Sequence, residues 1–509
     1  MKRREFISGI PATGGYLLLQ PRLWSRSKVP SFHPFQLGIA SGDPTPNSVV
    51  LWTRLVTEHL EPIGSEPVPV IWQLSTDEKM RRIIRSGTVA AEPQLAHSVH
   101  VELEGLEPDR TYWYRFVSGH AESQVGRTRT LPDPQAPVDR LRFATASCQH
   151  WELGLFNAYD HMVKDDVRFV IHLGDYIYDV ARGDFRKHKN AAQPRTLEDF
   201  RSRHAQYKTD SSLQAAHAQL PFFFAIDNHD ATPDRPLTPE SAGLRAVAYQ
   251  AWYEHMPVRR GPAESWRAHK FTRGIDFGTL ARINLLDTRQ FRDSEEICGN
   301  GTDPDFGFGN YRPICGDEAR PDRTMLGSEQ TDWLLGQFKD SPARWNVIAS
   351  TVLFSPFRFQ HRGAEWFYKG SWDGYPQNRA IIFNAIRDNQ LRNPVILSGD
   401  LHSSWAIELP AGPERKDESP IAVEFLGPSI CSSWPAPLND PIEASLARNP
   451  HVKFYNGTER GYCLFSVTPD QWETQFRAVD NLHSHDSKTR VLATFAVNSD
   501  SPKLIRQSR

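Results

Sequence analysis

Four short apolar segments of this chain each end on a residue type that binds metal ions, and this coincidence constrains the fold most. The segments run from Leu141 to Ser147, Val167 to Leu173, Pro221 to Ile226 and Asn393 to Ser398. Short continuous apolar segments bounded by turn residues are typical of buried strands. Because open α/β sheets bind ligands beyond the carboxyl ends of their strands, the residues that follow should meet in one crevice. The pattern favours a hydrolase with two metal ions.

Length and composition set the frame. A chain of 509 residues with 39 % hydrophobic and 24 % charged residues predicts a globular protein of two or three domains. The net charge of -2 provides no basic field, so nucleic acid is not expected as the main partner. We expect a monomer with no stable membrane span in its mature form, because apolar stretches of spanning length are missing beyond the N-terminus.

Residues 1–31 are predicted to be a signal segment. Arg3 and Arg4 precede a weakly hydrophobic stretch without acidic residues from Ser8 to Gln20, and this arrangement is similar to a twin-arginine export signal. A basic, disordered tail is the alternative, since no Ala-x-Ala cleavage site is visible. The prediction implies a periplasmic or secreted protein, with the twin-arginine export machinery as a partner.

Residues 32–136 alternate short β-type segments with turn signals, which predicts an antiparallel sandwich. Leu106-Glu107-Pro108 followed by Tyr112 resembles the corner of fibronectin type III-like domains. A Pro-rich joint at 132–137 then separates this domain from a catalytic domain over 137–509.

The second domain mixes strands with long helical segments. The pattern predicts helices over 244–253 and 329–338 and strands over 281–286 and 345–350. The polar stretch after Asn481 offers little core, and we expect it to pack as a C-terminal tail.

The sequence leaves different roles open for the cysteines. Cys298 and Cys315 flank a Gly-rich loop in which a disulfide would restrict chain entropy, and spacing alone leaves the pairing open. Cys431 and Cys463 are either buried hydrophobes or a second pair. Cys148, at the end of a predicted strand, is either a buried hydrophobe or a thiolate ligand that would favour a transition metal.

The second and fourth strand ends each combine an aspartate with a tyrosine or a histidine. Asp175 follows a glycine and could bridge two cations, with the Tyr178 phenol three residues on. The alternative for Asp175 is a helix N-cap. Asp400 and His402 would share a face in extended geometry, His402 suiting a transition metal and Asp400 an oxygen-preferring ion.

The third strand end is Asp227-Asn228-His229-Asp230. The Asn228 amide oxygen is a neutral hard ligand, and His229 could protonate a leaving group. Asp227 or Asp230 could orient that histidine. A polar turn that caps the next helix is the alternative interpretation.

These motifs, in this order, resemble the alkaline phosphatase D family of the calcineurin-like metallophosphoesterases over nearly the whole chain. The motifs that carry the resemblance are Arg3-Arg4, Gly38 to Pro44, Ser147-Cys148-Gln149, His172 to Tyr178, Leu286 to Gln290, Trp372 to Pro376 and Gly399 to His402. The resemblance implies an α/β fold, a four-layer metallophosphoesterase sandwich of two sheets, preceded by an all-β fibronectin III-like domain.

The resemblance also implies a ligand set. Ferric iron would be held by Cys148, Asp175, Tyr178 and His402, while calcium would be held by Asp175, Asn228 and Asp400. A metal-activated hydroxide would attack phosphorus in line while His229 protonates the departing oxygen. Arg289 would clamp phosphate oxygens, or form a buried structural ion pair.

One motif departs from the family. The family shows Trp-Asp-Asp-His-Glu followed by paired asparagines, whereas this chain has Ile226-Asp227-Asn228-His229-Asp230. Asn228 matches the Gly-Asn-His motif of the wider superfamily, which keeps a ligand but removes a charge. The affinity and identity of the second metal are therefore open, and an additional calcium site has no support.

The leading hypothesis is an exported, metal-dependent hydrolase of phosphate monoesters, diesters or both. A phospholipase D-like or cell-wall polymer phosphodiesterase is the first alternative. A surface binding protein with a catalytically degenerate centre is the second, and the presence of all four predicted iron ligands argues against it.

Overall fold

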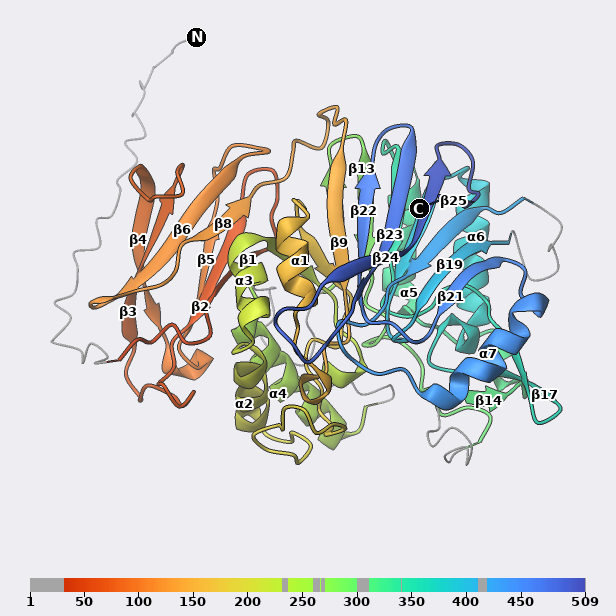
Figure 1. Cartoon of the computed structure of the whole chain (residues 1–509), viewed down its shortest axis with the longest axis horizontal. Helices are drawn as coiled ribbons and strands as arrows, with labels where there is room; N and C mark the ends of the chain where they lie inside the picture. Colours follow the sequence, from red (N-terminus) through yellow and green to blue (C-terminus); the bar gives the residue numbers. More distant parts are fainter. Residues whose placement is uncertain are drawn as a thin grey trace, which may run out of the picture.

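The computed structural model describes residues 32–230, 237–259, 266, 271–299, 311–339, 341–410 and 419–508. Two large sheets dominate this part of the chain (Figure 1). The strands of the first, in spatial order, are β25 (Ile505–Arg506), β24 (Thr489–Asn498), β23 (Gln471–Val479), β22 (Gly461–Val467), β9 (Leu141–Ala146), β10 (Val170–His172), β11 (Pro221–Phe224), β1 (Ile39–Gly42), β2 (Val49–Arg54) and β5 (Ser98–Leu103). Those of the second are β12 (Arg273–Phe277), β13 (Ala281–Leu285), β15 (Trp345–Ala349), β18 (Pro394–Ser398), β20 (Ala422–Leu426), β19 (Ser404–Leu409) and β21 (Val452–Asn456).

The large sheets form the inner layers of a four-layer α/β sandwich. Alternate side chains of each strand point to opposite faces, so Ile171 of β10 packs between the sheets while Val170 packs under helices. The helices over the first sheet are α1 (Ala158–Lys164), α2 (Leu197–Tyr207), α3 (Ser211–Gln219) and α4 (Pro239–His255). The helices over the second are α5 (Gly327–Phe338) and α6 (Pro376–Asp388). This is the predicted fold class.

The N-terminal strands form a β-sandwich, at the left of Figure 1. Its outer sheet consists of β4 (Ile83–Ala91), β3 (Val68–Ser75), β6 (Thr111–Ser118), β7 (Ala121–Glu122) and β8 (Gly126–Arg129). The corner has the expected form, because the Tyr112 hydroxyl accepts a hydrogen bond from the Glu107 backbone N–H at 3.0 Å.

The inner sheet of this sandwich is continuous with the catalytic sheet. Strand β1 pairs in parallel with β11, with Ser41 opposite Pro221 and Gly42 opposite Phe222. A Cβ atom on Gly42 would lie 2.4 Å from the Pro257 carbonyl oxygen, so this close approach requires glycine. The domain boundary at residue 136 stays a prediction, and one hydrogen-bonded sheet crosses between its two sides.

Asp43, in the motif from Gly38 to Pro44, lies at this junction. The Asp43 carboxylate pairs with Arg273 and accepts a hydrogen bond from the Arg259 backbone N–H at 2.9 Å. A buried carboxylate needs such partners. The motif therefore stabilises the junction, away from the predicted metal ligands.

Predicted helices and strands of the second half are confirmed, with one exception near the C-terminus. Helix α4 begins earlier than predicted, because Thr238 caps it and Pro239 occupies its first turn. The expectation of a C-terminal tail after Asn481 is wrong. Strand β24 pairs with β23, and its Phe495 and Val497 side chains lie in the core between the sheets.

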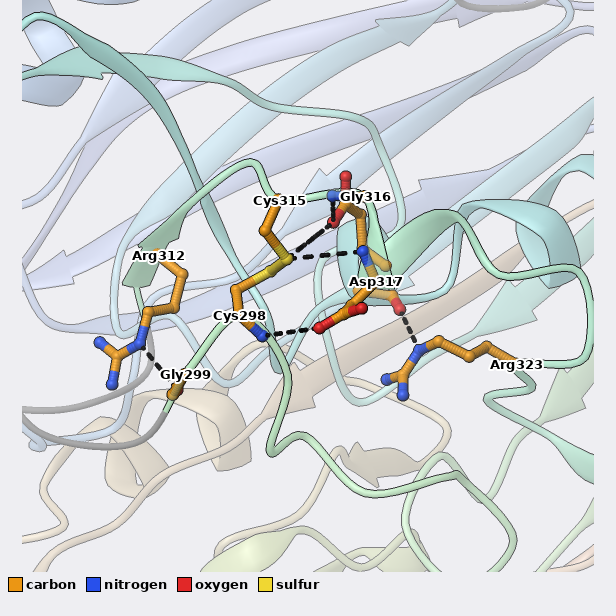
Figure 2. The surroundings of a disulfide bond; sticks show 9 residues. Cys298, Gly299, Arg312, Cys315, Gly316, Asp317 and Arg323 are labelled. Atoms are coloured by element: carbon orange, nitrogen blue, oxygen red, sulfur yellow. Dashed lines mark hydrogen bonds between the residues drawn. A yellow bond between two sulfur atoms is a disulfide. The ribbon is translucent and has the colours of Figure 1, made fainter.

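Cys298 and Cys315 form a disulfide with a Cα–Cα distance of 5.5 Å (Figure 2). The Glu318 carboxylate lies beside it, 3.7 and 3.6 Å from the two sulfur atoms. The loop that the bridge closes contains β14 (Tyr311–Pro313), which forms a small sheet with β17 (Ala364–Tyr368) and β16 (Phe359–His361). Helix α7 (Asn439–Ser445) packs near this sheet. Cys148, Cys431 and Cys463 are free and buried.

Among the described helices, none is both long enough and apolar enough to cross a membrane.

Candidate metal centre

The predicted metal ligands meet at the carboxyl ends of β9, β10, β11 and β18. The Cys148 thiol, an Asp175 carboxylate oxygen and a His402 ring nitrogen all lie within 4.8 Å of one another. The Cys148 Sγ atom is 3.7 Å from Asp175 Oδ2, and the Tyr178 hydroxyl is 2.9 Å from His402 Nε2. All four residues of the predicted iron set therefore face one small volume.

The tautomer of His402 follows from its other nitrogen. Nδ1 lies 2.8 Å from the Ser433 carbonyl oxygen, which can only accept, so Nδ1 carries the proton. Nε2 then presents a lone pair toward Tyr178. Burial lowers the pKa of His402 to about 3, so the ring is neutral and suited to bind a metal.

The backbone is strained where it carries these side chains. Positive φ angles of 57°, 52°, 67° and 49° occur at Cys148, Asp175, Asp400 and His402. Such conformations cost energy for residues with a Cβ atom and cluster at functional sites. Gly174 has a φ of 98°, and a Cβ atom there would lie 2.4 Å from Asp227 Cβ. The glycine lets two strand ends approach closely enough to bring their acids together.

The second group of predicted ligands surrounds the Arg289 guanidinium. Its Nη2 donates to Asn228 Oδ1 at 3.2 Å and to Asp400 Oδ1 at 3.1 Å, and its Nε donates to Asp227. Nη1 lies 3.5 Å from Glu295 Oε1. These contacts match the buried ion pair that the sequence left open beside a phosphate clamp.

The carboxylates of this centre carry more negative charge than the described residues compensate. Oδ2 of Asp227 and Oδ2 of Asp400 are buried and have no hydrogen-bond partner among the described residues. Burial, and then the charge of Asp227, raises the pKa of Asp175 and of Asp400 to about 8. Burial likewise raises the pKa of the Cys148 thiol, and the charge of Asp175 adds to the effect. Such a donor set fits a cation, which would favour the deprotonated forms.

The partner of His229 is an acid that the sequence interpretation did not consider. His229 Nδ1 lies 2.6 Å from Asp179 Oδ1, and the imidazole stacks on the Tyr178 ring with centroids 4.3 Å apart. Burial is the largest effect and opposes ionisation of Asp179, but the hydrogen bond with His229, the charge of His229 and the hydrogen bond with Gln193 act together to lower the pKa of Asp179. Asp179 directly follows the motif from His172 to Tyr178, and this adjacency was the available signal.

Asp230 has a different set of contacts from the one expected. Its two carboxylate oxygens accept the backbone N–H groups of Asp175, Tyr176 and Asp227 at 3.0 Å and of Ile177 at 3.3 Å. The hydrogen bond to the His229 ring that was expected from Asp227 or Asp230 is made by Asp179 instead. Asp230 holds the Asp175 loop in place.

Comparison with known proteins gives the site its context. The model of the PhoD-like phosphatase N-terminal domain matches residues 22–132, and that of the PhoD-like phosphatase matches residues 143–476. Alkaline phosphatase D of Bacillus subtilis (strain 168) is 40 % identical over 532 residues, which covers 99 % of this chain and 89 % of that protein.

Solved structures agree with this assignment. The structure of PhoD superposes with a TM-score of 0.86 at 39 % identity, covering 94 % of this chain and 93 % of that chain. A purple acid phosphatase from yellow lupin (Lupinus luteus) seeds shares the fold, with a TM-score of 0.57 at 12 % identity over 92 % of this chain and 74 % of that one. Sequence, fold and the clustered ligands agree, and the chain belongs to the PhoD-like phosphatase family.

Proposed function

We propose that this protein is an exported, metal-dependent hydrolase of phosphoric esters that acts on monoesters, diesters or both. The observation that carries the proposal is the convergence of Cys148, Asp175 and His402 ligand atoms within 4.8 Å, with Tyr178 beside them. A thiolate, a phenolate, an imidazole and a carboxylate together suit ferric iron better than a hard divalent ion. Such an ion supplies a Lewis acid that polarises a phosphoryl oxygen and lowers the pKa of water.

The second ion of the proposal is calcium. Asp175, Asn228 and Asp400 offer oxygen atoms only, and calcium tolerates an irregular oxygen cage. Arg289 pairs with one of these residues, Asp400, and with the neighbouring Asp227. We infer that, with calcium held by these oxygens, the Arg289 guanidinium would no longer be needed to balance Asp400 and would face the phosphate oxygens, as the fork geometry of arginine allows.

His229 has the geometry of a proton donor. Asp179 accepts a hydrogen bond from Nδ1–H, so a proton to be transferred would be carried on Nε2. Transfer of the Nε2 proton to the departing alkoxide would remove the charge that develops as the ester bond breaks. Asp230 keeps the Asp175 loop in position for this step.

Export is the remaining part of the proposal. Arg3 and Arg4 support a twin-arginine signal and a periplasmic or secreted location, and they lie outside the described residues. Fractionation of cells that express the chain with both arginines changed to lysine tests this point. Retention of the variant in the cytoplasm is expected, and unchanged export would contradict it.

Metal analysis combined with turnover tests the catalytic proposal. The purified protein should contain iron, and it should hydrolyse 4-nitrophenyl phosphate, its bis ester, or both. After treatment with a calcium chelator, added calcium should restore activity while the iron stays bound, and Asn228→Asp should lower the calcium concentration required. Recovery of activity with zinc or manganese alone would refute the metal assignment. The absence of turnover of both esters would refute the proposed hydrolase activity.

A further inference from the structure

A second charged pocket lies at the opposite end of the strands that carry the metal ligands. It has a volume of about 210 Å³ and is lined by Arg129, Arg140, Arg142, Asp166 and Arg168. Arg142 is near the amino end of β9, whereas Cys148 follows its carboxyl end. Cys148 is six positions along the chain from Arg142, and most of this segment is extended, so the pocket lies on the order of 20 Å from the metal centre.

Two of these arginines share a single carboxylate oxygen. Asp109 Oδ1 lies 3.0 Å from Arg129 Nη2 and 2.7 Å from Arg168 Nη2. The three side chains are 45 %, 35 % and 20 % exposed, respectively, so solvent reaches them. One carboxylate cannot neutralise two guanidinium groups, and a positive charge remains at this point.

The other two arginines have no carboxylate partner in the described part of the chain. The Arg142 Nε atom is buried and lacks a hydrogen-bond acceptor there, a state that costs free energy. Arg140 is exposed beside it at the start of β9. The Arg168 backbone N–H donates to the Arg142 carbonyl at 2.8 Å, which fixes the two segments side by side.

We propose that this pocket binds a phosphate group as a second, non-catalytic site. Among the described residues that line the pocket or form ion pairs with its arginines, four guanidinium groups meet the carboxylates of Asp109 and Asp166, which leaves a surplus of two positive charges. Arginine forks bind tetrahedral oxyanions through paired, charge-assisted hydrogen bonds, and a phosphate dianion supplies the missing acceptors. The site joins the end of β8 to the start of β9 and does not depend on the catalytic proposal.

Calorimetric titration of the full chain with inorganic phosphate at constant ionic strength tests this site. We compare wild type with the double variant Arg140→Gln/Arg142→Gln, and with Arg81→Gln/Arg82→Gln in the turn between β3 and β4 as a charge-matched control. Wild type and control should bind one phosphate more than the double variant, or bind it at least tenfold more tightly. The double variant should keep the wild-type kcat and KM for 4-nitrophenyl phosphate, which distinguishes this site from the metal centre.

Further measurements separate the possible outcomes. Arg140 is exposed, so Arg140→Gln alone should fold normally and still weaken phosphate binding. Titration with dimethyl phosphate identifies the source: weaker binding than inorganic phosphate indicates free phosphate, and equal binding indicates a phosphodiester of a larger molecule. Equal phosphate binding by wild type and the double variant, or an equal response to chloride, would overturn the proposal.

Discussion

At the scale of single residues, Cys148 makes the sharpest prediction. Thiolate ligation stabilises ferric iron and colours the protein through charge transfer, and the serine hydroxyl does neither. Cys148→Ser should therefore lose iron and absorbance, and its turnover should fall by at least roughly 10- to 100-fold, the loss seen even for outer-shell changes. Metal analysis, visible spectra and circular dichroism measure this. A folded variant with full iron, colour and activity would remove Cys148 from the centre.

His229 and Asp179 should act as one unit. His229→Ala should reduce turnover by ~100- to 10,000-fold for esters with poor leaving groups, and less for activated aryl esters. Asp179→Asn should show the same leaving-group dependence, because it replaces the charged acceptor of the 2.6 Å hydrogen bond from Nδ1 with a neutral amide. Kinetics of both single variants and the double variant test the coupling. Additive losses would show that Asp179 does not act through His229.

Asp400 connects pH with stability in the metal-free protein. The pKa of Asp400 is raised to about 8 by burial and by Asp227, above the ordinary value of 3.8. Between these two values the folded chain holds a proton that the unfolded chain has released, so this group lowers the free energy of unfolding as pH rises.

The free energy of unfolding of metal-free wild type should therefore fall relative to that of metal-free Asp400→Asn as the pH rises from 5 to 9. The difference between the two proteins should change by an amount on the order of a few kcal/mol. Urea unfolding of both metal-free proteins at the two pH values measures the difference. The same stability difference at both pH values would contradict the raised pKa.

The sequence predicted these residues unevenly, for a physical reason. Ligand types at strand ends identify the six predicted metal ligands because strand order in a sheet brings such ends together. The role of Asp179 was not predicted, because a hydrogen bond to a histidine fifty positions away depends on side-chain directions in two loops. The contacts of Arg289 were not predicted for the same reason.

At the scale of elements, the disulfide makes its own prediction. The Cys298–Cys315 bridge closes a loop with a sequence separation of 17, which restricts the unfolded chain. Cys298→Ala/Cys315→Ala should lower stability by about 3 kcal/mol, the value expected for a loop of this size. Calorimetric melting with and without reductant measures it. Reductant should lower the Tm of wild type and leave the double variant unchanged, and a Tm shift in both would point elsewhere.

Element prediction succeeded where local patterns decide and failed where distant partners decide. The apolar spacing from Leu244 to Tyr253 was sufficient to predict helix α4. Strand β24 was missed because a polar turn precedes it, although Phe495 and Val497 alternate with smaller or polar residues as strands do. The pairing of β1 with β11 could not be predicted, since parallel partners leave no local signal.

At the scale of the whole molecule, the pairing of β1 with β11 makes the folding of residues 137–509 depend on residues 32–136. Removal of residues 32–136 would expose the edge of β11 and uncover apolar side chains of α3, such as Ala218 in the sandwich core. We expect residues 137–509 alone to aggregate, whereas residues 32–509 stay monodisperse. Gel filtration of both chains tests this, and a monomeric, active shorter chain would refute it.

The position of β22 has a consequence for how the protein is made. Strand β9, which leads to Cys148, is hydrogen-bonded on one side to β22, and Cys463 lies opposite Thr145. A ribosome therefore completes almost the entire chain before the strand that borders the Cys148 strand emerges from its tunnel. Contacts between such distant segments form slowly. Nascent chains that end before Gly461 should hold no iron, so metal loading becomes a late step that reports completion of the sheet.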